Sequence, residues 1–393
     1  MIINSLLDND LYKLSMMQAV LHQFPSAQVE YKFACRTKDV DLRPCLEDIK
    51  VAVLALERLS FLDKELAFLR KLRFMKPDFI NFLQYFRFNP DAFVSLSADA
   101  DPDQNGGISI RIKGPWLQTI LFEIPILAIV NQVYFEQLRR EPHVSYQTWQ
   151  NEGLKRLQSK LDMLKYHPDF CFADFGTRRR FNGEWQRTVV RLAAESNKHF
   201  VGTSNVEMAM QNDVTPIGTM AHEWLQAGQA LTHPANSQKF MLDAWVQEYR
   251  GDLGIALTDV VGIDAFLRDF DLFFAKLYDG VRHDSGDPLE FTDKMIDHYA
   301  TLGIEPWTKT LVFSDGLDFP KAIKILKHVN SRAKVSFGIG TNLTNDVGFD
   351  PINIVIKMVS CNGQPVAKLS DSPGKNMCED PEYVTYLKKT FKV

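Results

Sequence analysis

Eight short apolar runs organise the chain from residue 170 onward, and they restrict its fold more than any other feature. Each run ends in glycine, charged or hydroxyl residues and then gives way to a helical pattern. Buried parallel strands have this appearance because both faces of their sheet are covered. Eight strand-helix units with uneven spacing predict an irregular α/β barrel. The runs begin near Phe170, His199, Val214, Gly254, Leu272, Thr310, Lys334 and Asn353.

The first third of the chain has a different texture, which predicts a smaller α+β domain. Apolar residues recur at helical spacing from Leu14 to Phe24, and residues 29–35 and 107–114 alternate as strands. Further helices are expected over residues 46–73, 115–140 and 144–166.

The length of 393 residues is too great for one ordinary core, so two domains are expected. Residues 1–140 are predicted to form the N-terminal α/β domain with its linking helix, which residues 360–393 rejoin. Residues 141–359 are predicted to form the barrel.

The charge and composition give no reason to expect nucleic acid or a membrane as a partner. The formal charge is −4, from 45 basic and 49 acidic residues with no long run of one sign. The first ten residues lack a basic leader before an apolar run, and the five scattered cysteines suit a reducing compartment. We therefore expect a soluble cytoplasmic protein.

The residues that directly follow the strands of such a barrel meet at one rim, where ligands bind. Polar residues distant in sequence are therefore expected to converge there. The candidates are Phe175, Arg178, Thr203, Ser204, Asn205, His222, Arg282, Asp284, Ser285, Asp287, Asp315, Gly316, Gly338, Gly340 and Thr341.

His222 follows a run that breaks at Pro216 and Gly218, so it is expected in the first turn of a helix. Unpaired N–H groups and partial positive charge at a helix start disfavour a second proton on the ring and favour a nearby phosphate. A neutral imidazole is a nucleophile. The alternative is a histidine that only packs or caps the helix.

Glycine-containing turns end two late runs, Ser314-Asp-Gly316 and Phe337-Gly-Ile-Gly-Thr341. Backbone N–H groups in such turns can approach a phosphate at the start of the next helix. A tight strand-to-helix turn explains the same glycines without a ligand.

Charged residues follow two other runs. Arg178 opens a group of three arginines that can grip a carboxylate or phosphate, or form a solvated basic loop. Asp284 and Asp287 lie beside Arg282, where carboxylates can hold Mg²⁺ on a phosphorylated substrate, bind sugar hydroxyls or cap the next helix. Because Asp287 precedes a proline, as at a helix start, Asp284 is the preferred ligand.

Seven short motifs stand in order along the chain: Asp10-Leu-Tyr12-Lys13, Asp174-Phe-Gly-Thr-Arg178, Gly202-Thr-Ser-Asn205, Gly218-Thr-Met-Ala-His222-Glu, Arg282-His-Asp-Ser-Gly286, Ser314-Asp-Gly316 and Phe337-Gly-Ile-Gly-Thr341. In this set and order, the chain resembles the nicotinate phosphoribosyltransferase family of type II phosphoribosyltransferases. The resemblance implies that nicotinate reacts with 5-phosphoribosyl 1-pyrophosphate (PRPP) to give nicotinate mononucleotide and pyrophosphate. It also implies coupled ATP hydrolysis, as in a ligase, and a place at the entry to NAD salvage.

The resemblance further assigns a role to each matching position. Phe175 stacks on the pyridine, and Tyr12 of a neighbouring subunit covers the other face, so that a homodimer shares its active sites. Arg282 holds the nicotinate carboxylate beside Thr203 and Ser204. The remaining implied roles are phosphate binding by Arg178, Asp315, Gly316, Gly338, Gly340 and Thr341, ribose and Mg²⁺ contact by Asp284, and phosphorylation of His222 by ATP.

Three rival functions remain open at this stage. Nicotinamide phosphoribosyltransferase is the first, and quinolinate phosphoribosyltransferase is more distant. Amide-using relatives carry an aspartate where this chain has Ser204, and such a carboxylate would repel nicotinate. A non-catalytic phosphosugar-binding protein is the third, against which the joint presence of His222, Arg282 and Asp284 argues.

Overall fold

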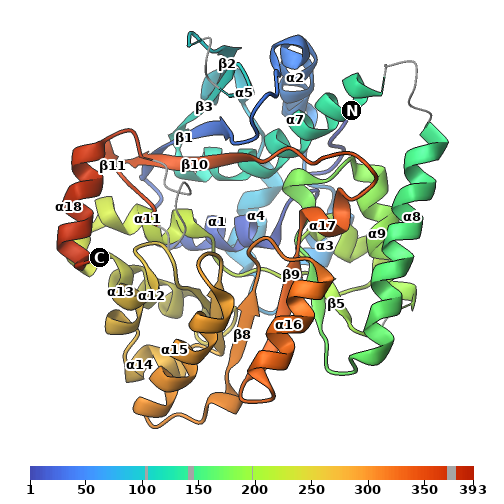
Figure 1. The fold of residues 1–393 in the computed structure, drawn as a ribbon. Coiled ribbons are helices and arrows are strands. Elements are labelled where there is room, and N and C mark those ends of the chain that lie inside the picture. Colours follow the sequence, from blue (N-terminus) through green and yellow to red (C-terminus); the bar gives the residue numbers. More distant parts are fainter. Residues whose placement is uncertain (102–104, 140–145, 197, 370–377) are drawn as a thin grey trace.

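The computed structural model describes residues 1–101, 105–139, 146–196, 198–369 and 378–393, and it builds the chain around two sheets (Figure 1). One sheet has five strands in the order β11-β10-β1-β3-β2, and all its pairings are antiparallel. The other has six parallel strands in the order β5-β4-β9-β8-β7-β6. The predicted combination of an α/β fold with an N-terminal α+β domain is confirmed.

The antiparallel sheet combines both ends of the chain. Figure 1 shows β10, in red, running beside β1, in blue, above the parallel strands. The run near Asn353 was expected as a barrel strand, and that prediction is wrong. Its residues are apolar on both faces because β10 lies between helices α7 and α11, which gives it the texture of a parallel strand. The strands are β1 (Gln28–Cys35), β2 (Val94–Ala98), β3 (Ile108–Pro115), β10 (Ile354–Cys361) and β11 (Gln364–Pro365).

The parallel sheet contains six strands where eight were predicted. The run at Leu272 begins as helix α14 (Leu272–Leu277), and its strand starts only at Gly280. A Cβ atom at Gly280 would lie 1.9 Å from the Thr310 carbonyl oxygen, so only glycine allows β7 to approach β8 here. The strands are β4 (Phe172–Asp174), β5 (Phe200–Thr203), β6 (Ile255–Leu257), β7 (Gly280–His283), β8 (Thr310–Phe313) and β9 (Lys334–Ile339).

An irregular segment, residues 214–219, bridges the two edge strands of this sheet. The Ile217 amide donates to the Thr203 carbonyl at 2.8 Å, which attaches the segment to β5. The Thr219 hydroxyl donates to the Ile255 carbonyl at 2.9 Å, which attaches it to β6. The run near Val214 therefore completes an irregular α/β barrel without forming a strand of its own.

The helices cover both layers. The predicted helix over residues 115–140 is found as α6, a 3₁₀ turn and α7, and the predicted helix over residues 144–166 is found as α8. Residues 140, 144 and 145 lie outside the described residues. The predicted domain boundary at 140/141 lies outside them too. The α-helices are α1 (Leu11–Gln23), α2 (Leu46–Leu54), α3 (Asp63–Leu69), α4 (Pro77–Tyr85), α5 (Pro90–Phe93), α6 (Trp116–Thr119), α7 (Glu123–Leu138), α8 (Tyr146–Met163), α9 (Gly183–Ser196), α10 (Val206–Asn212), α11 (His222–Leu231), α12 (Ser237–Tyr249), α13 (Ile263–Asp269), α14, α15 (Pro288–Thr301), α16 (Phe319–Val329), α17 (Thr341–Thr344) and α18 (Pro381–Phe391).

One helical stretch, Trp116–Leu138, is long and apolar enough to cross a membrane by length and composition. However, 89% of its apolar window is buried inside the structure, which is the pattern of a core helix.

Candidate functional site

A cavity of about 580 Å³ lies between the carboxyl ends of the barrel strands and the antiparallel sheet. Most of the predicted rim residues converge on it, as the barrel interpretation requires. Those that line it are Tyr12, Phe175, Arg178, Ser204, His222, Arg282, Asp284, Asp315, Gly316, Gly340 and Thr341.

Gly338 lies behind the cavity wall and supports Phe175. A Cβ atom at position 338 would lie 2.1 Å from Cδ2 of the Phe175 ring. The glycine is therefore explained by the space that the ring needs. Of the two glycines predicted here, only Gly340 lines the cavity.

Tyr12 belongs to the cavity of its own chain. Its backbone nitrogen would lie 2.9 Å from a Cβ atom at Gly218, which also lines the cavity. One chain thus supplies both Tyr12 and Phe175 to one cavity, which contradicts the expected contribution from a neighbouring subunit. The resemblance could not reveal this, because a motif does not state which copy of the chain it serves.

Thr203 and Ser204 follow β5 but face different partners. The fully buried Thr203 hydroxyl donates to Asp174 Oδ2 at 2.8 Å, so Thr203 supports the site from behind. The Ser204 hydroxyl donates to Asp10 Oδ1 at 2.7 Å. Burial raises the pKa of Asp10 to about 6, and the Ser204 hydrogen bond opposes the shift. Asp10 and Ser204 therefore form one polar unit at the cavity wall.

His222 is the first residue of α11, as predicted, and it is buried. Its Nε2 atom lies 3.0 Å from Asp259 Oδ1 and 2.8 Å from Lys368 Nζ. Burial, assisted by the Lys368 charge, lowers the pKa of His222 to about 4, so the ring is neutral at pH 7. Both the Asp259 carboxylate and the Lys368 ammonium face Nε2; the tautomer that donates from Nε2 to Asp259 keeps its lone pair on Nδ1.

Asp259 holds this end of the site together. Its Oδ2 atom accepts hydrogen bonds from Lys368 Nζ and Ser285 Oγ, each at 2.5 Å. Burial opposes its ionisation, but Lys368 and His222 outweigh burial and keep the pKa of Asp259 well below its usual value. The carboxylate is therefore charged, and both its oxygens have partners.

Asp284 and Arg282 occupy the barrel side of the cavity. Burial opposes ionisation of Asp284, but Arg282 and His222 lower its pKa to about 2. The Ser314 hydroxyl donates to Asp284 Oδ1 at 2.7 Å. Arg282 Nε is buried and has no hydrogen-bond partner among the residues that the structure describes, which suits an anionic ligand.

Asp287 has the structural role expected from its proline. Its side chain accepts hydrogen bonds from the backbone amides of Leu289 and Glu290, at 2.7 and 2.9 Å, and so caps α15.

A divalent cation fits this arrangement through Asp284. His222, Asp259 and Asp284 offer ligand atoms within 4.8 Å of one another. Asp259 is a poor ligand because its Oδ2 atom already accepts hydrogen bonds from Lys368 and Ser285. His222 is a poor ligand because Mg²⁺ prefers oxygen to imidazole ligands. Asp284 is therefore the best protein ligand, and Mg²⁺ commonly takes only one or two carboxylates beside substrate phosphates.

Backbone turns line another part of the cavity. Residues 314–318 follow β8, and residues 340–342 follow β9. Gly316 has a φ of +53°, in the left-handed region that favours glycine, with open space around its Cβ position. The first turn precedes α16, and the second includes Gly340, the N-cap of α17, and the first two residues of that helix; unpaired amides at helix starts suit a phosphate.

Cations gather on the side of the antiparallel sheet. Burial and the Arg178 charge lower the pKa of Lys357 to about 7. The same two causes lower the pKa of Arg179 to about 9. Like charges held this close favour a bound anion, since the anion relieves their mutual repulsion. The cation cluster consists of Arg36, Arg178, Arg179, Lys357 and Lys368.

Several known proteins similar to this chain belong to one family. A model of the nicotinate phosphoribosyltransferase (NAPRTase) family matches residues 170–393, and a model of the NAPRTase N-terminal domain matches residues 7–131. A nicotinate phosphoribosyltransferase from Bordetella pertussis is 55% identical over 100% of this chain and 96% of its own length. One from Burkholderia mallei is 54% identical over 100% and 98%. The chain belongs to the nicotinate phosphoribosyltransferase family.

Solved structures of the same family agree in fold. The crystal structure of nicotinate phosphoribosyltransferase from Vibrio cholerae has a TM-score of 0.93 and 40% identity, covering 100% of this chain and 94% of the other. The enzyme from Porphyromonas gingivalis has a TM-score of 0.92 and 35% identity, with 100% of both chains covered.

The family motifs miss several residues of the site. Asp259 lies two residues after β6, and residues that follow barrel strands meet at the rim, so its place in the sequence also indicates the site. Lys357 and Lys368 lie on and after β10, in a stretch with no polar motif, and no sequence signal indicates that they face the cavity.

Proposed function

We propose that this chain transfers the phosphoribosyl group of PRPP to nicotinate, giving nicotinate mononucleotide and pyrophosphate. The observation that carries the proposal is that one cavity is lined by two aromatic side chains, Tyr12 and Phe175, by Arg282, by backbone turns suited to a phosphate, and by the cation cluster. The family's name, nicotinate phosphoribosyltransferase, supports transfer of a phosphoribosyl group to nicotinate. The reaction belongs to the salvage of NAD precursors.

The pyridine ring of nicotinate lies between Phe175 and Tyr12 in this proposal. Flat aromatic faces suit an aromatic ring, and Arg282 supplies the countercharge for the carboxylate. Ser204 adds no negative charge of its own, which favours nicotinate over nicotinamide. The Ser204 hydroxyl donates to Asp10, so Ser204 and Asp10 together form this part of the pyridine site.

PRPP carries two anionic ends, and the cavity offers two anion sites. The turns at Gly316 and Gly340 suit the compact 5-phosphate. The cation cluster suits the larger charge of the diphosphate, which leaves in the reaction. The ribose then spans the cavity past Asp284.

The chemistry is mainly electrostatic. Displacement at the anomeric carbon forms an N–C bond and breaks a C–O bond through a cationic ribosyl centre, while the diphosphate takes the electron pair. The pyridine nitrogen carries no proton, so no general base is needed. Mg²⁺ held by Asp284 supplies charge neutralisation on the diphosphate when bound. The aromatic pair contributes by holding the ring nitrogen in line.

We also propose that ATP drives the reaction through His222. Nδ1 attacks the γ-phosphorus, an N–P bond forms, the P–O bond to ADP breaks, and ADP leaves with the electron pair. Asp259 holds the Nε2 proton and stabilises the ring as it becomes positive. The phosphoryl group adds about two negative charges at the cavity edge, which changes substrate and product affinity.

Two measurements test the proposal. Purified protein with nicotinate, PRPP and Mg²⁺ should form nicotinate mononucleotide, and nicotinamide should serve poorly. With labelled ATP, an acid-labile and base-stable phosphate should appear on the protein. A protein that binds PRPP without any product would instead be a phosphosugar-binding member of the family.

A further inference from the structure

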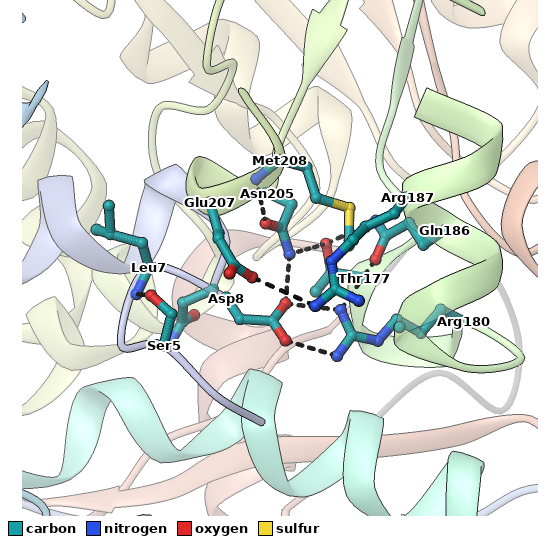
Figure 2. A network of polar contacts seen from close by, with 12 residues as sticks. Ser5, Leu7, Asp8, Thr177, Arg180, Gln186, Arg187, Asn205, Glu207 and Met208 are labelled. Atoms are coloured by element: carbon teal, nitrogen blue, oxygen red, sulfur yellow. Dashed lines mark hydrogen bonds and ion pairs between the residues drawn. The ribbon is translucent and has the colours of Figure 1, made fainter. Parts of the chain in front are cut away.

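We infer that Asp8 is a positioning residue for the pyridine end of the cavity. Its carboxylate joins three separate segments, each of which carries residues that line the cavity (Figure 2). The segments are the N-terminal stretch, the loop after β4 and the loop after β5. The inference rests on the proposed function, since it concerns where nicotinate binds.

The first link is an ion pair between Asp8 and Arg180. The Arg180 Nη1 and Nη2 atoms donate to Asp8 Oδ1 and Oδ2 at 2.6 and 2.7 Å, and neither side chain has any exposed surface. This bidentate geometry fixes the direction as well as the distance between the two groups. Arg180 lies two residues after Arg178, so the pair anchors the loop that also carries Phe175.

The second link is a hydrogen bond from Asn205. Its Nδ2 atom donates to Asp8 Oδ1 at 2.7 Å, while its Oδ1 atom accepts from the Met208 amide at 3.0 Å and caps α10. Asn205 directly follows Ser204. The orientation of the Ser204 loop is therefore fixed from one side by α10 and from the other by Asp8.

Backbone hydrogen bonds also tie the N-terminal segment to the loop after β5. The Val206 amide donates to the Asn9 carbonyl at 3.0 Å, and the Leu11 amide donates to the Ser204 carbonyl at 2.8 Å. Asp10 and Tyr12 follow within four residues of Asp8. A change at Asp8 is thus transmitted to both walls of the pyridine site.

Asp8 acts through these segments and not on the ligand. Asp8, Arg180 and Asn205 all lie behind the cavity wall, whereas Tyr12, Phe175 and Ser204 lie on it. Burial would raise the pKa of Asp8, but the Arg180 charge outweighs it and holds that pKa below its usual value, so the carboxylate is ionised. The ion pair therefore persists across the pH range of ordinary assays.

The test uses two variants of the full chain, Asp8→Asn and the double variant Asp8→Asn/Arg180→Gln. Asp8→Asn keeps the shape but leaves the Arg180 charge buried and unpaired, which destabilises the fold. The double variant removes both charges together and avoids that penalty. If Asp8→Asn fails to fold, the double variant decides the question.

The matched control is Glu248→Gln. Glu248 is another buried carboxylate, which accepts from Gln18 Nε2 and pairs with Lys76, both at 2.9 Å, away from the cavity. Its loss should lower the melting temperature while the KM for nicotinate stays at the wild-type value. This control separates a general loss of stability from a change in position.

The expected result is a rise of about tenfold or more in the KM for nicotinate in both Asp8 variants, since a misplacement near 1 Å costs up to about 100-fold. The KM for PRPP should rise less than that for nicotinate, because Asp8 contacts neither the turn at Gly316 nor the turn at Gly340, although the loop that it anchors also carries Arg178. The phosphorylation of His222 should remain near wild type. A wild-type KM for nicotinate in the folded double variant would overturn the inference. An equal rise in Glu248→Gln, or an equal rise in the KM for PRPP, would also overturn it. Absence of nicotinate mononucleotide from the wild type would instead reject the proposed function.

Discussion

Replacement of Lys357 by methionine should remove a pH-dependent part of the affinity for PRPP. Lys357 extends from β10 to the cavity in the cation cluster, and burial together with Arg178 lowers its pKa to about 7. Methionine keeps an unbranched apolar stem and removes the charge. The effect should therefore appear only where the lysine is protonated.

The direction of the pH dependence follows from linkage. An anion stabilises the charged form and raises the pKa, so binding is favoured below pH 7 and weakens as pH rises through 7. In the free protein about half of the Lys357 side chains are charged at pH 7, and about a tenth at pH 8. A charge-assisted hydrogen bond contributes about 2 kcal/mol, which is a factor of about 30.

The assay is the KM for PRPP between pH 6 and pH 9 in the wild type and in Lys357→Met. The ratio of the two values cancels the titration of the substrate phosphates. We expect a ratio of about 30 at pH 6 and about 3 at pH 8, since the wild type loses most of its charge in that interval. Lys64→Met, at an exposed position of α3, is the matched control and should give a ratio of one throughout.

A ratio that stays constant across this pH range would refute the reasoning, because it would mean that Lys357 does not titrate there. Stability offers an independent check. The folded pKa of Lys357 is lower than the unfolded value, so protonation opposes folding below pH 7 and this cost disappears as pH rises toward the unfolded pKa. Lys357→Met should therefore raise the melting temperature of the ligand-free protein at pH 6 more than at pH 9.

Three further predictions concern the reaction itself. His222→Ala should abolish ATP hydrolysis and the acid-labile label while some ATP-independent synthesis remains, since the substrate sites are intact; unchanged ATP coupling would contradict the assignment. Mixing inactive Tyr12→Ala with inactive Asp284→Ala should restore no activity, because one chain supplies both residues to one cavity, and recovery in verified heterodimers would show a shared site. Ser204→Asp should cut kcat/KM for nicotinate severely, since the new carboxylate repels the nicotinate carboxylate by about 4 kcal/mol at 4 Å and an effective dielectric near 20. Measurement of kcat/KM for both pyridines tests this, and comparable wild-type values for the two would contradict the selectivity.

The sequence determined the features that depend on near neighbours in the chain. His222 starts a helix and Asp287 caps one, as their local sequences predict, because capping needs only the residues of one turn. The barrel strands were found from unbroken apolar runs, which report burial on both faces. The family could also be identified from the sequence, because each of its motifs is a short run of neighbouring residues.

Tertiary structure alone decided which elements pair and which charges meet. The apolar run of β10 carries the same burial signal as a barrel strand, yet it pairs with β1, because burial does not specify a pairing partner. The roles of Lys357, Lys368 and Asp8 depend on contacts with residues far away in the chain. The spacing of residues in the sequence does not predict such contacts. Tyr12 lies in its own chain's cavity because the N-terminal segment packs along the loop after β5, and only the packing of the whole chain sets that path.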